Sequence, residues 1–275
     1  MRARYPERIV CLTEETTETL YLLGEERRIV GISGYTVRPA RARKEKPRVS
    51  AFLSARVDKI LELQPDLVLG FSDLQADIAR DLARAGLNIL VFNQRSVDEI
   101  LSMILTLASM VGAAEKGTRL VAALEKNLDE IRAAAGRFPR RPRVYFEEWD
   151  EPMISGIRWV SELVEIAGGE DIFSELSRSQ SASGRIVPDP LAVLEKQPDV
   201  ILASWCGKKF RPERVAARPG WHQVPAVRDQ QLFEIKSADI LQPGPAALTD
   251  GLRRIYEILR AFSAREPGIP SPGAG

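Results

Sequence analysis

The feature that most constrains the fold is a nine-residue motif that occurs twice, about half a chain apart. Residues 61–69 read LELQPDLVL, and residues 194–202 read LEKQPDVIL. In each copy a helical stretch stops at Pro-Asp, because proline cannot continue a helix. The apolar run that follows is typical of a strand buried on both faces. The segments around the two copies also correspond, which predicts two similar lobes.

Helical periods, glycines and short apolar runs alternate in both halves of the chain. This order is typical of lobes built on parallel sheets, because a helix must carry the chain back to start each new strand. We expect strands at residues 8–12, 28–32, 67–71, 88–92 and 143–146, and helices at residues 16–23, 57–63, 74–85, 97–111, 115–137 and 160–167.

The predicted fold class is α/β, with two Rossmann-like parallel-sheet lobes joined by one long α-helix. We divide the 275 residues into an N-terminal lobe (1–112), a linking helix (113–138), a C-terminal lobe (139–265) and a flexible tail (266–275). The tail is rich in proline and glycine, which favours fraying.

Charge and cysteine content exclude several classes of protein. Lys and Arg number 39 against 38 Asp and Glu, so there is no electrostatic reason to expect nucleic acid or an anionic membrane as a partner. The basic run at residues 38–46 is interpreted as a solvated loop. Two cysteines cannot form a disulfide framework, and we expect both Cys11 and Cys206 to be buried thiols.

The N-terminal residues bear on location. Near the start, the apolar stretch at residues 9–12 ends before Thr13. Four apolar residues are too few for a secretory signal. We therefore expect a cytoplasmic protein, with a periplasmic protein whose leader was removed before residue 1 as the alternative.

Catalytic patterns are sparse. The single histidine, His222, excludes a His-rich metal site, and a Ser-His-Asp triad would depend on it alone. Gly207-Lys208 lacks the first glycine and the final Ser or Thr of a phosphate-binding loop. The acids at residues 147, 148, 150 and 151 are interpreted as solvated. The prediction is a binding protein that is not an enzyme.

Aromatic side chains at predicted strand ends point to a ligand pocket. Phe71, Trp149 and Trp205 each stand where a buried strand finishes. In parallel α/β lobes, ligands bind beyond the carboxyl ends of the strands. Flat apolar walls suit a large ligand with polar edges. We expect three polar residues to contact those edges: Ser72, Asp150 and Gln242.

Several segments together resemble one class of substrate-binding protein. The segments are RIV at residues 8–10, IVGISGY at 29–35, VS at 49–50 with Phe52, the stretch 60–69, ISG at 154–156 and AGGEDIF at 167–173. This pattern, over residues 8–262, resembles the helical-backbone (class III) proteins that serve ABC importers of vitamin B12, haem and ferric siderophores. Within that class it is most similar to the vitamin-B12 binders.

The resemblance implies a ligand and its contacts. The ligand is a corrinoid, held without a covalent bond in the cleft between the lobes of a monomer. Tyr35, Phe52, Phe71 and Met153 match contact positions, and Arg185 stands near the place of an aromatic wall.

The resemblance also leaves the partner and the ligand open. Docking on an ABC permease uses one Glu on each lobe, for which this chain offers only Asp77 and Asp189. Haem would need an axial ligand such as Tyr35 or His222. A siderophore would need basic residues, for which the candidates are Arg158 and Arg185. An enzyme acting on the bound molecule would use Asp150 or Glu148 as its acid or base.

Overall fold

The computed structural model describes residues 4–264, which form two compact units. Unit 1 comprises residues up to 94, residues 98–125 and residues 242–246. Unit 2 comprises residues 95–97, residues 126–241 and the residues from 247 onward. One long helix, α6 (Ala114–Ala135), contributes its first half to unit 1 and its second half to unit 2. The predicted tail, residues 266–275, lies outside the described residues.

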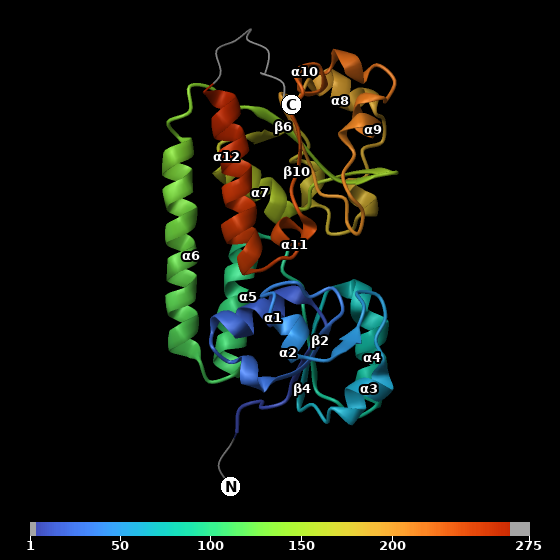
Figure 1. The fold of residues 1–275 in the computed structure, drawn as a ribbon, viewed down its shortest axis with the longest axis vertical. Helices are drawn as coiled ribbons and strands as arrows, with labels where there is room; N and C mark the ends of the chain where they lie inside the picture. Colours follow the sequence, from blue (N-terminus) through green and yellow to red (C-terminus); the bar gives the residue numbers. More distant parts are fainter. Residues whose placement is uncertain (1–3, 265–275) are drawn as a thin grey trace. The chain divides into compact units, whose positions relative to one another are not determined.

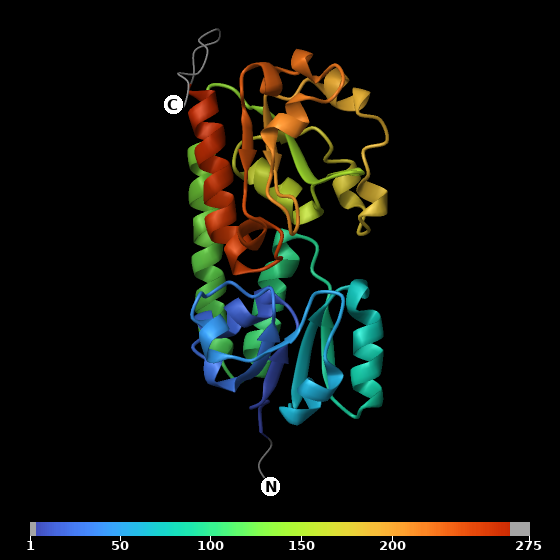
Figure 2. The ribbon, with the colours of Figure 1, turned by 45° about the vertical axis from the view of Figure 1, so that its right-hand side comes forward.

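Unit 1 is built on a five-stranded sheet in the order β3-β2-β1-β4-β5, and all its strands are parallel. Strand order reverses beside β1, which is the arrangement of a Rossmann-like lobe. In Figures 1 and 2, α3 and α4 lie on one side of this sheet and α1 lies on the other. Helices on both faces explain why β4, LVLGF, is buried along its whole length.

The elements of unit 1 have the following bounds: β1 (Ile9–Cys11), α1 (Glu14–Leu22), η1 (Glu26–Arg28), β2 (Ile29–Ser33), α2 (Ala42–Glu45), β3 (Arg48–Ser50), α3 (Val57–Glu62), β4 (Leu67–Phe71), η2 (Asp73–Gln75), α4 (Ala76–Arg84), β5 (Ile89–Phe92) and most of α5 (Val97–Met110).

Unit 2 contains a second five-stranded sheet, in the order β10-β9-β6-β7, with β8 paired to β6. The prediction of two α/β lobes with parallel sheets, joined by one long helix, is confirmed. One strand differs, because β7 runs antiparallel to β6. The two are joined by the short Glu151-Pro152 turn, which is a hairpin connection and not a helical crossover.

The elements of unit 2 have the following bounds: β6 (Arg143–Asp150), β7 (Met153–Ser155), α7 (Arg158–Ile166), β8 (Glu170–Asp171), η3 (Leu176–Arg178), η4 (Ser183–Arg185), α8 (Leu191–Lys196), β9 (Val200–Ala203), α9 (Pro212–Ala216), η5 (Trp221–Gln223), α10 (Pro225–Arg228), β10 (Leu232–Glu234), α11 (Ser237–Ile240), the π-helical turn η6 (Ala247–Gly251) and α12 (Leu252–Ser263).

The two copies of the repeated motif adopt the same local conformation and form the same backbone contact in their units. Gln64 and Gln197 both adopt positive φ, 47° and 43°, and turn the chain sharply between helix and strand. The Asp66 carboxylate accepts the backbone N–H of Arg8 at 3.0 Å, and the Asp199 carboxylate accepts that of Arg143 at 2.9 Å. Each aspartate therefore holds the start of the neighbouring strand, which explains why the Pro-Asp pair occurs in both copies.

Two expectations about single segments are wrong in part. The basic run at residues 38–46 is mostly exposed, as expected, but it is not a plain loop, because it contains α2, and Arg38 and Arg41 pair with Glu18 and Glu26 at 2.9 Å each. Cys11 is buried as expected, but Cys206 is exposed. Cys206 lies past the end of β9, where the sheet no longer covers it.

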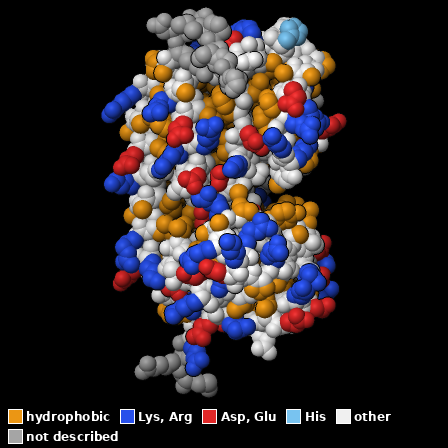
Figure 3. Space-filling model, in the orientation of Figure 1, with side chains coloured by type: hydrophobic (Ala, Val, Ile, Leu, Met, Phe, Trp, Pro, Cys, Tyr) orange, Lys and Arg blue, Asp and Glu red, His pale blue; other side chains and the backbone are white. Residues whose placement is uncertain are grey.

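No helix within residues 4–264 combines the length and the apolar character needed to cross a bilayer. On the face shown in Figure 3, basic and acidic side chains are interspersed over both units.

Candidate functional site

Exposed apolar side chains gather at the carboxyl ends of the unit 1 strands. Tyr35 follows β2, Leu53 follows β3 and Leu74 follows β4, and they are 59%, 68% and 58% exposed. Val37 is also exposed and Phe52 is half-buried. Four of the nine large hydrophobic residues exposed in the described part of the chain lie here. We call the loops after β1 to β5 the carboxyl edge of unit 1.

Gln75 fixes the geometry of this edge. Its Nε2 donates to the carbonyl of Phe52 at 2.9 Å, and its Oε1 accepts the N–H of Phe71 at the same distance. The side chain is buried, so these bonds replace water that would otherwise satisfy both backbone groups. Gln75 thus ties the loop after β3 to the end of β4. This role of Gln75 could not be predicted from the sequence, because a single glutamine at the start of a helix forms no recognisable pattern.

Phe71 and Ser72 lie inside this edge. Phe71 is the last residue of β4 and only 5% exposed. Ser72 is buried at φ 64°, and its Oγ accepts the N–H of Leu74 at 3.3 Å. Ser72 therefore shapes the turn that presents Leu74 to solvent.

Helix α1 brings three buried carboxyls to the same edge, where β1 ends. Burial raises the pKa of Glu14 and of Glu15 to about 7. Glu18 is charge-paired with Arg38 at 2.9 Å and accepts the N–H of Ala246 at 3.0 Å. Buried carboxyls without full ionic pairing favour their neutral form, because the charge would lose its hydration.

A short crossing segment of the chain, Gln242–Ala246, packs on these acids. Gly244 lies against Glu15 so closely that a Cβ would not fit, and the Gln94 side chain donates to the Pro243 carbonyl at 2.9 Å. Gln242, a predicted contact, is half-buried at the start of this segment. It belongs to unit 1, although our sequence division placed it in the C-terminal lobe.

In unit 2 the predicted strand at residues 143–146 is too short. Strand β6 continues through Asp150, so Trp149 and Asp150 do not follow the strand but form its end. The extension exists because β7 pairs with these polar residues, which the hydrophobic pattern alone could not reveal. Trp149 is half-buried, and its Nε1 donates to the Glu151 carbonyl at 2.8 Å.

Asp150 is buried and bound by two cations, so the expectation of solvated acids at the end of this strand is wrong for Asp150, as it is for the buried Glu147. Lys208 forms an ion pair with it, and Arg214 Nη1 lies 3.2 Å from its Oδ2. The Lys208 Nζ also lies 4.0 Å from the centre of the Trp149 ring. The strand end, the loop after β9 and α9 thus meet at one charged cluster.

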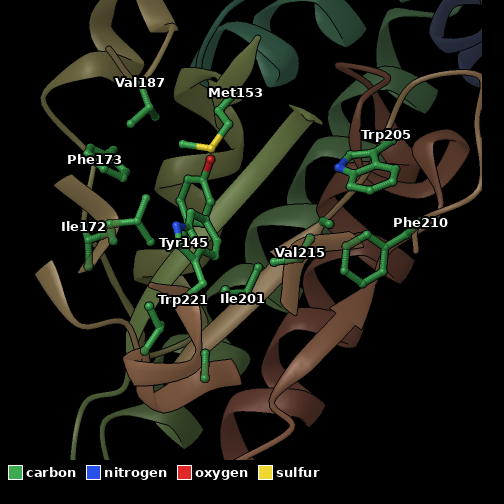
Figure 4. Close-up of a cluster of buried hydrophobic side chains, with 14 residues drawn as sticks. Tyr145, Met153, Ile172, Phe173, Val187, Ile201, Trp205, Phe210, Val215 and Trp221 are labelled. Atoms are coloured by element: carbon green, nitrogen blue, oxygen red, sulfur yellow. The ribbon is translucent and has the colours of Figure 1, made fainter. Parts of the chain in front are cut away.

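Trp205 is not at a pocket wall, because its side chain is 2% exposed. It packs against Phe210 with ring centres 5.1 Å apart, and its Nε1 donates to the buried Glu147 at 3.0 Å. Arg218 completes this buried ion pair at 2.5 Å. Figure 4 shows Trp205 within the hydrophobic cluster of unit 2, beside Phe210 and Val215. The sequence correctly predicted that Trp205 follows the end of a strand, here β9. It could not predict that the following loop folds over this strand end.

Met153 and Arg185 are also buried. Met153 is 7% exposed and belongs to the cluster of Figure 4. Arg185 is 2% exposed and binds Glu148 through both terminal nitrogens, at 2.5 and 3.1 Å. Its guanidinium is therefore neutralised within unit 2.

The remaining candidate residues either pair with neighbouring side chains or lie exposed on the surface. Arg158 pairs with Glu162 at 2.8 Å on the surface of α7. Asp77 and Asp189 are exposed, the first paired with Arg80 and the second accepting the N–H of Leu191. His222 is exposed in η5. Within residues 4–264, His, Cys, Asp and Glu do not gather in a group of three able to hold a metal ion.

Comparison with known proteins identifies the family. The family model for periplasmic binding proteins matches residues 9–238. An uncharacterized ABC transporter substrate-binding lipoprotein of Bacillus subtilis, YvrC, is 23% identical over 270 residues, covering 95% of this chain and 82% of that protein. The vitamin B12-binding protein of Vibrio cholerae is 26% identical over 268 residues, covering 92% and 89%.

Solved structures share the fold. The periplasmic heme-binding protein RhuT of Roseiflexus sp. RS-1 superposes with a TM-score of 0.78 at 25% identity, covering 92% of this chain and 99% of that one. The periplasmic vitamin B12-binding protein BtuF of Vibrio cholerae superposes with a TM-score of 0.74 at 24% identity, covering 96% and 100%.

The expectation of a cytoplasmic protein is wrong. The matching family is that of periplasmic binding proteins, and the relatives are described as periplasmic proteins or as a lipoprotein, which points to an extracytoplasmic location. The expectation rested on the first residues of the sequence, which say nothing about what precedes them. With its two α/β units and its family match over most of its length, this chain belongs to the periplasmic binding protein family and is a substrate-binding protein of the ABC-importer type.

Proposed function

We propose that this protein binds a corrinoid without a covalent bond and does no chemistry on it. The observation that carries the proposal is the apolar group on the carboxyl edge of unit 1, in which Tyr35, Val37, Leu53 and Leu74 are exposed and Phe52 is half-buried. Exposed apolar patches of this kind on soluble proteins mark binding surfaces. A corrin ring has broad apolar faces and an amide rim, which suits apolar walls with backbone and hydroxyl groups between them.

The named relatives support this ligand. Vitamin B12-binding proteins of Vibrio cholerae and of two Yersinia species align over 78% to 92% of the chain. In unit 2 we propose Trp149, a half-buried aromatic ring at the end of β6, as a ligand-binding residue.

Haem is the second candidate, and the Tyr35 phenol favours it. The side chain is 59% exposed on the loop after β2, and a tyrosine oxygen can serve as an axial ligand of haem iron. A ferric siderophore is less well supported, because Arg158 and Arg185 are each paired with a glutamate.

The proposed partner is an ABC permease. The exposed acids Asp77 on α4 and Asp189 before α8 are the docking residues that we propose. We further propose that the protein acts as a monomer, which sedimentation of the purified chain would test.

Titration of the purified protein with cobinamide, cobalamin and haemin, followed by absorbance, tests the ligand. We expect saturable binding of a corrinoid that Leu53→Ser weakens. The matched control is Leu22→Ser, which changes a leucine of similar exposure at the end of α1 and should bind normally.

Tyr35→Phe keeps the ring and removes the phenol oxygen, so it should abolish haem ligation and spare corrinoid binding. If the native chain binds haemin tightly and no corrinoid, and Tyr35→Phe loses the haemin binding, haem becomes the first candidate and the corrinoid the second.

A further inference from the structure

The Lys208 ammonium group lies against two aromatic rings and a carboxylate. Its Nζ is 4.0 Å from the centre of the Trp149 ring and 5.3 Å from that of Trp205, and it is ion-paired with Asp150. An aromatic face and a carboxylate together form a favourable environment for an ammonium or other positive group.

The two groups that hold this cation are fixed by the fold. The side chain of Asp150 is 3% exposed, and the Trp149 indole is oriented by its bond to the Glu151 carbonyl. Both residues lie at the end of β6, at the carboxyl edge where α/β folds bind ligands.

Lys208 itself is more exposed than the carboxylate that it contacts. Its side chain is 34% exposed, and it follows Gly207, which has a φ of 77° and open space where a Cβ would stand. A four-carbon chain beside such a glycine can move its ammonium group into water at little steric cost.

We propose that Trp149 and Asp150 form a subsite for a positively charged group of the ligand, which Lys208 fills with its own ammonium group. This inference rests on the proposed function and adds the charge of the ligand to it. Lys208 then acts as a competitor that a cationic ligand must displace.

The subsite can be tested without any corrinoid. The probe is tetramethylammonium chloride, compared with sodium chloride at equal ionic strength. The readout is the Trp149 indole N–H resonance in the ¹⁵N-labelled full chain, identified by its loss in Trp149→Phe. In Lys208→Met we expect tetramethylammonium to bind about threefold to tenfold more tightly than in the native chain. Lys209→Met, which changes the adjacent exposed lysine, should behave like the native chain.

Two outcomes of this titration overturn the proposal. One is equal binding of tetramethylammonium by the native chain and both lysine variants. The other is an equal response of the Trp149 resonance to sodium chloride. Adding Asp150→Asn to Lys208→Met should remove the gain, and a gain that persists would also exclude the carboxylate as part of the subsite. Melting temperatures of all variants establish that each is folded.

Corrinoid charge states provide the second measurement. Aquocyanocobinamide carries a single positive charge, and dicyanocobinamide, formed in excess cyanide, carries none. Lys208→Met should raise the affinity for the charged form relative to the neutral form about threefold to tenfold. An unchanged ratio would contradict the subsite. If neither form binds the native chain, the proposed function fails, while the tetramethylammonium titration still decides the subsite.

Discussion

Two tryptophans of unit 2 occupy neighbouring places in the fold but differ in surroundings. Trp205 is almost fully buried among apolar side chains and bonded to Glu147, whereas Trp149 is half-buried at the end of β6. Their ring faces both approach Lys208. Burial therefore separates a structural role for Trp205 from a proposed ligand contact for Trp149.

Substitution of each tryptophan tests this separation. Trp205→Ala should lower the free energy of unfolding by about 3–5 kcal/mol, because it leaves a cavity in a packed core. Trp149→Ala should cost less than half as much and should weaken corrinoid binding about tenfold, since it removes one apolar wall. Urea denaturation and absorbance titration measure the two effects. A larger stability loss in Trp149→Ala than in Trp205→Ala would contradict the assignment.

The pKa of Glu15 is raised from 4.5 to about 7, so we expect the stability of the protein to depend on pH. Burial is the main cause, and the neighbouring Glu18 adds to it, while the Thr13 hydroxyl opposes it. Glu14 behaves alike, with Glu15 and Glu18 raising its pKa and Arg43 lowering it. Between the ordinary pKa of 4.5 and the raised pKa of about 7, these two glutamates keep their protons in the folded chain but have lost them in the unfolded chain. The free energy of unfolding should therefore fall as pH rises through this window.

Glu15→Gln should flatten this dependence. The neutral amide resembles the protonated acid, so the variant should lose a pH-dependent term on the order of 2 kcal/mol. Urea denaturation at about pH 5 and about pH 8 measures the difference for both chains. Equal slopes for the native chain and Glu15→Gln would show that Glu15 does not titrate in this window.

At the scale of elements, the carboxyl edge of unit 1 depends on how η2 is attached. The Gln75 side chain links η2 to the end of β4 and to the loop after β3. Because the exposed Leu53 and Leu74 lie on the two segments that it joins, Gln75 positions the apolar group without being part of its surface.

Gln75→Leu should destabilise the protein by about 2 kcal/mol, because it removes the partners of a buried N–H and a buried carbonyl. We also expect weaker corrinoid binding, since the loop that carries Phe52 loses its attachment. Gln223→Leu, at an exposed position in η5, is the control and should stay within about 0.5 kcal/mol of the native chain. Stability equal to that of the control would show that water replaces both bonds.

For the whole molecule, ligand binding and folding are linked. A ligand that binds only the folded chain raises the free energy of unfolding by about 1.4 kcal/mol for each tenfold excess over its dissociation constant. Chemical denaturation with increasing cobinamide should follow this dependence. A rise with haemin and none with cobinamide would refute the corrinoid proposal in favour of haem.

The sequence by itself determined the architecture. The paired Pro-Asp motifs, the buried apolar runs and the helical period of α6 are local patterns, and each arises from a local cause: proline stops helices, and strands covered on both faces must be apolar. The two sheets and the long helix followed from them, whereas the resemblance to the helical-backbone class rests on separate short segments such as residues 29–35 and 167–173.

The tertiary structure decided which side chains are available at the carboxyl edges. Exposure of Tyr35, Leu53 and Leu74, and burial of Trp205, Met153 and Arg185, depend on how loops distant in sequence fold over strand ends. The pairing of Arg185 with Glu148 and of Lys208 with Asp150 joins residues 37 and 58 positions apart. Such contacts leave no periodic trace in the sequence, because a charged residue looks the same there whether it faces solvent, a partner or a ligand.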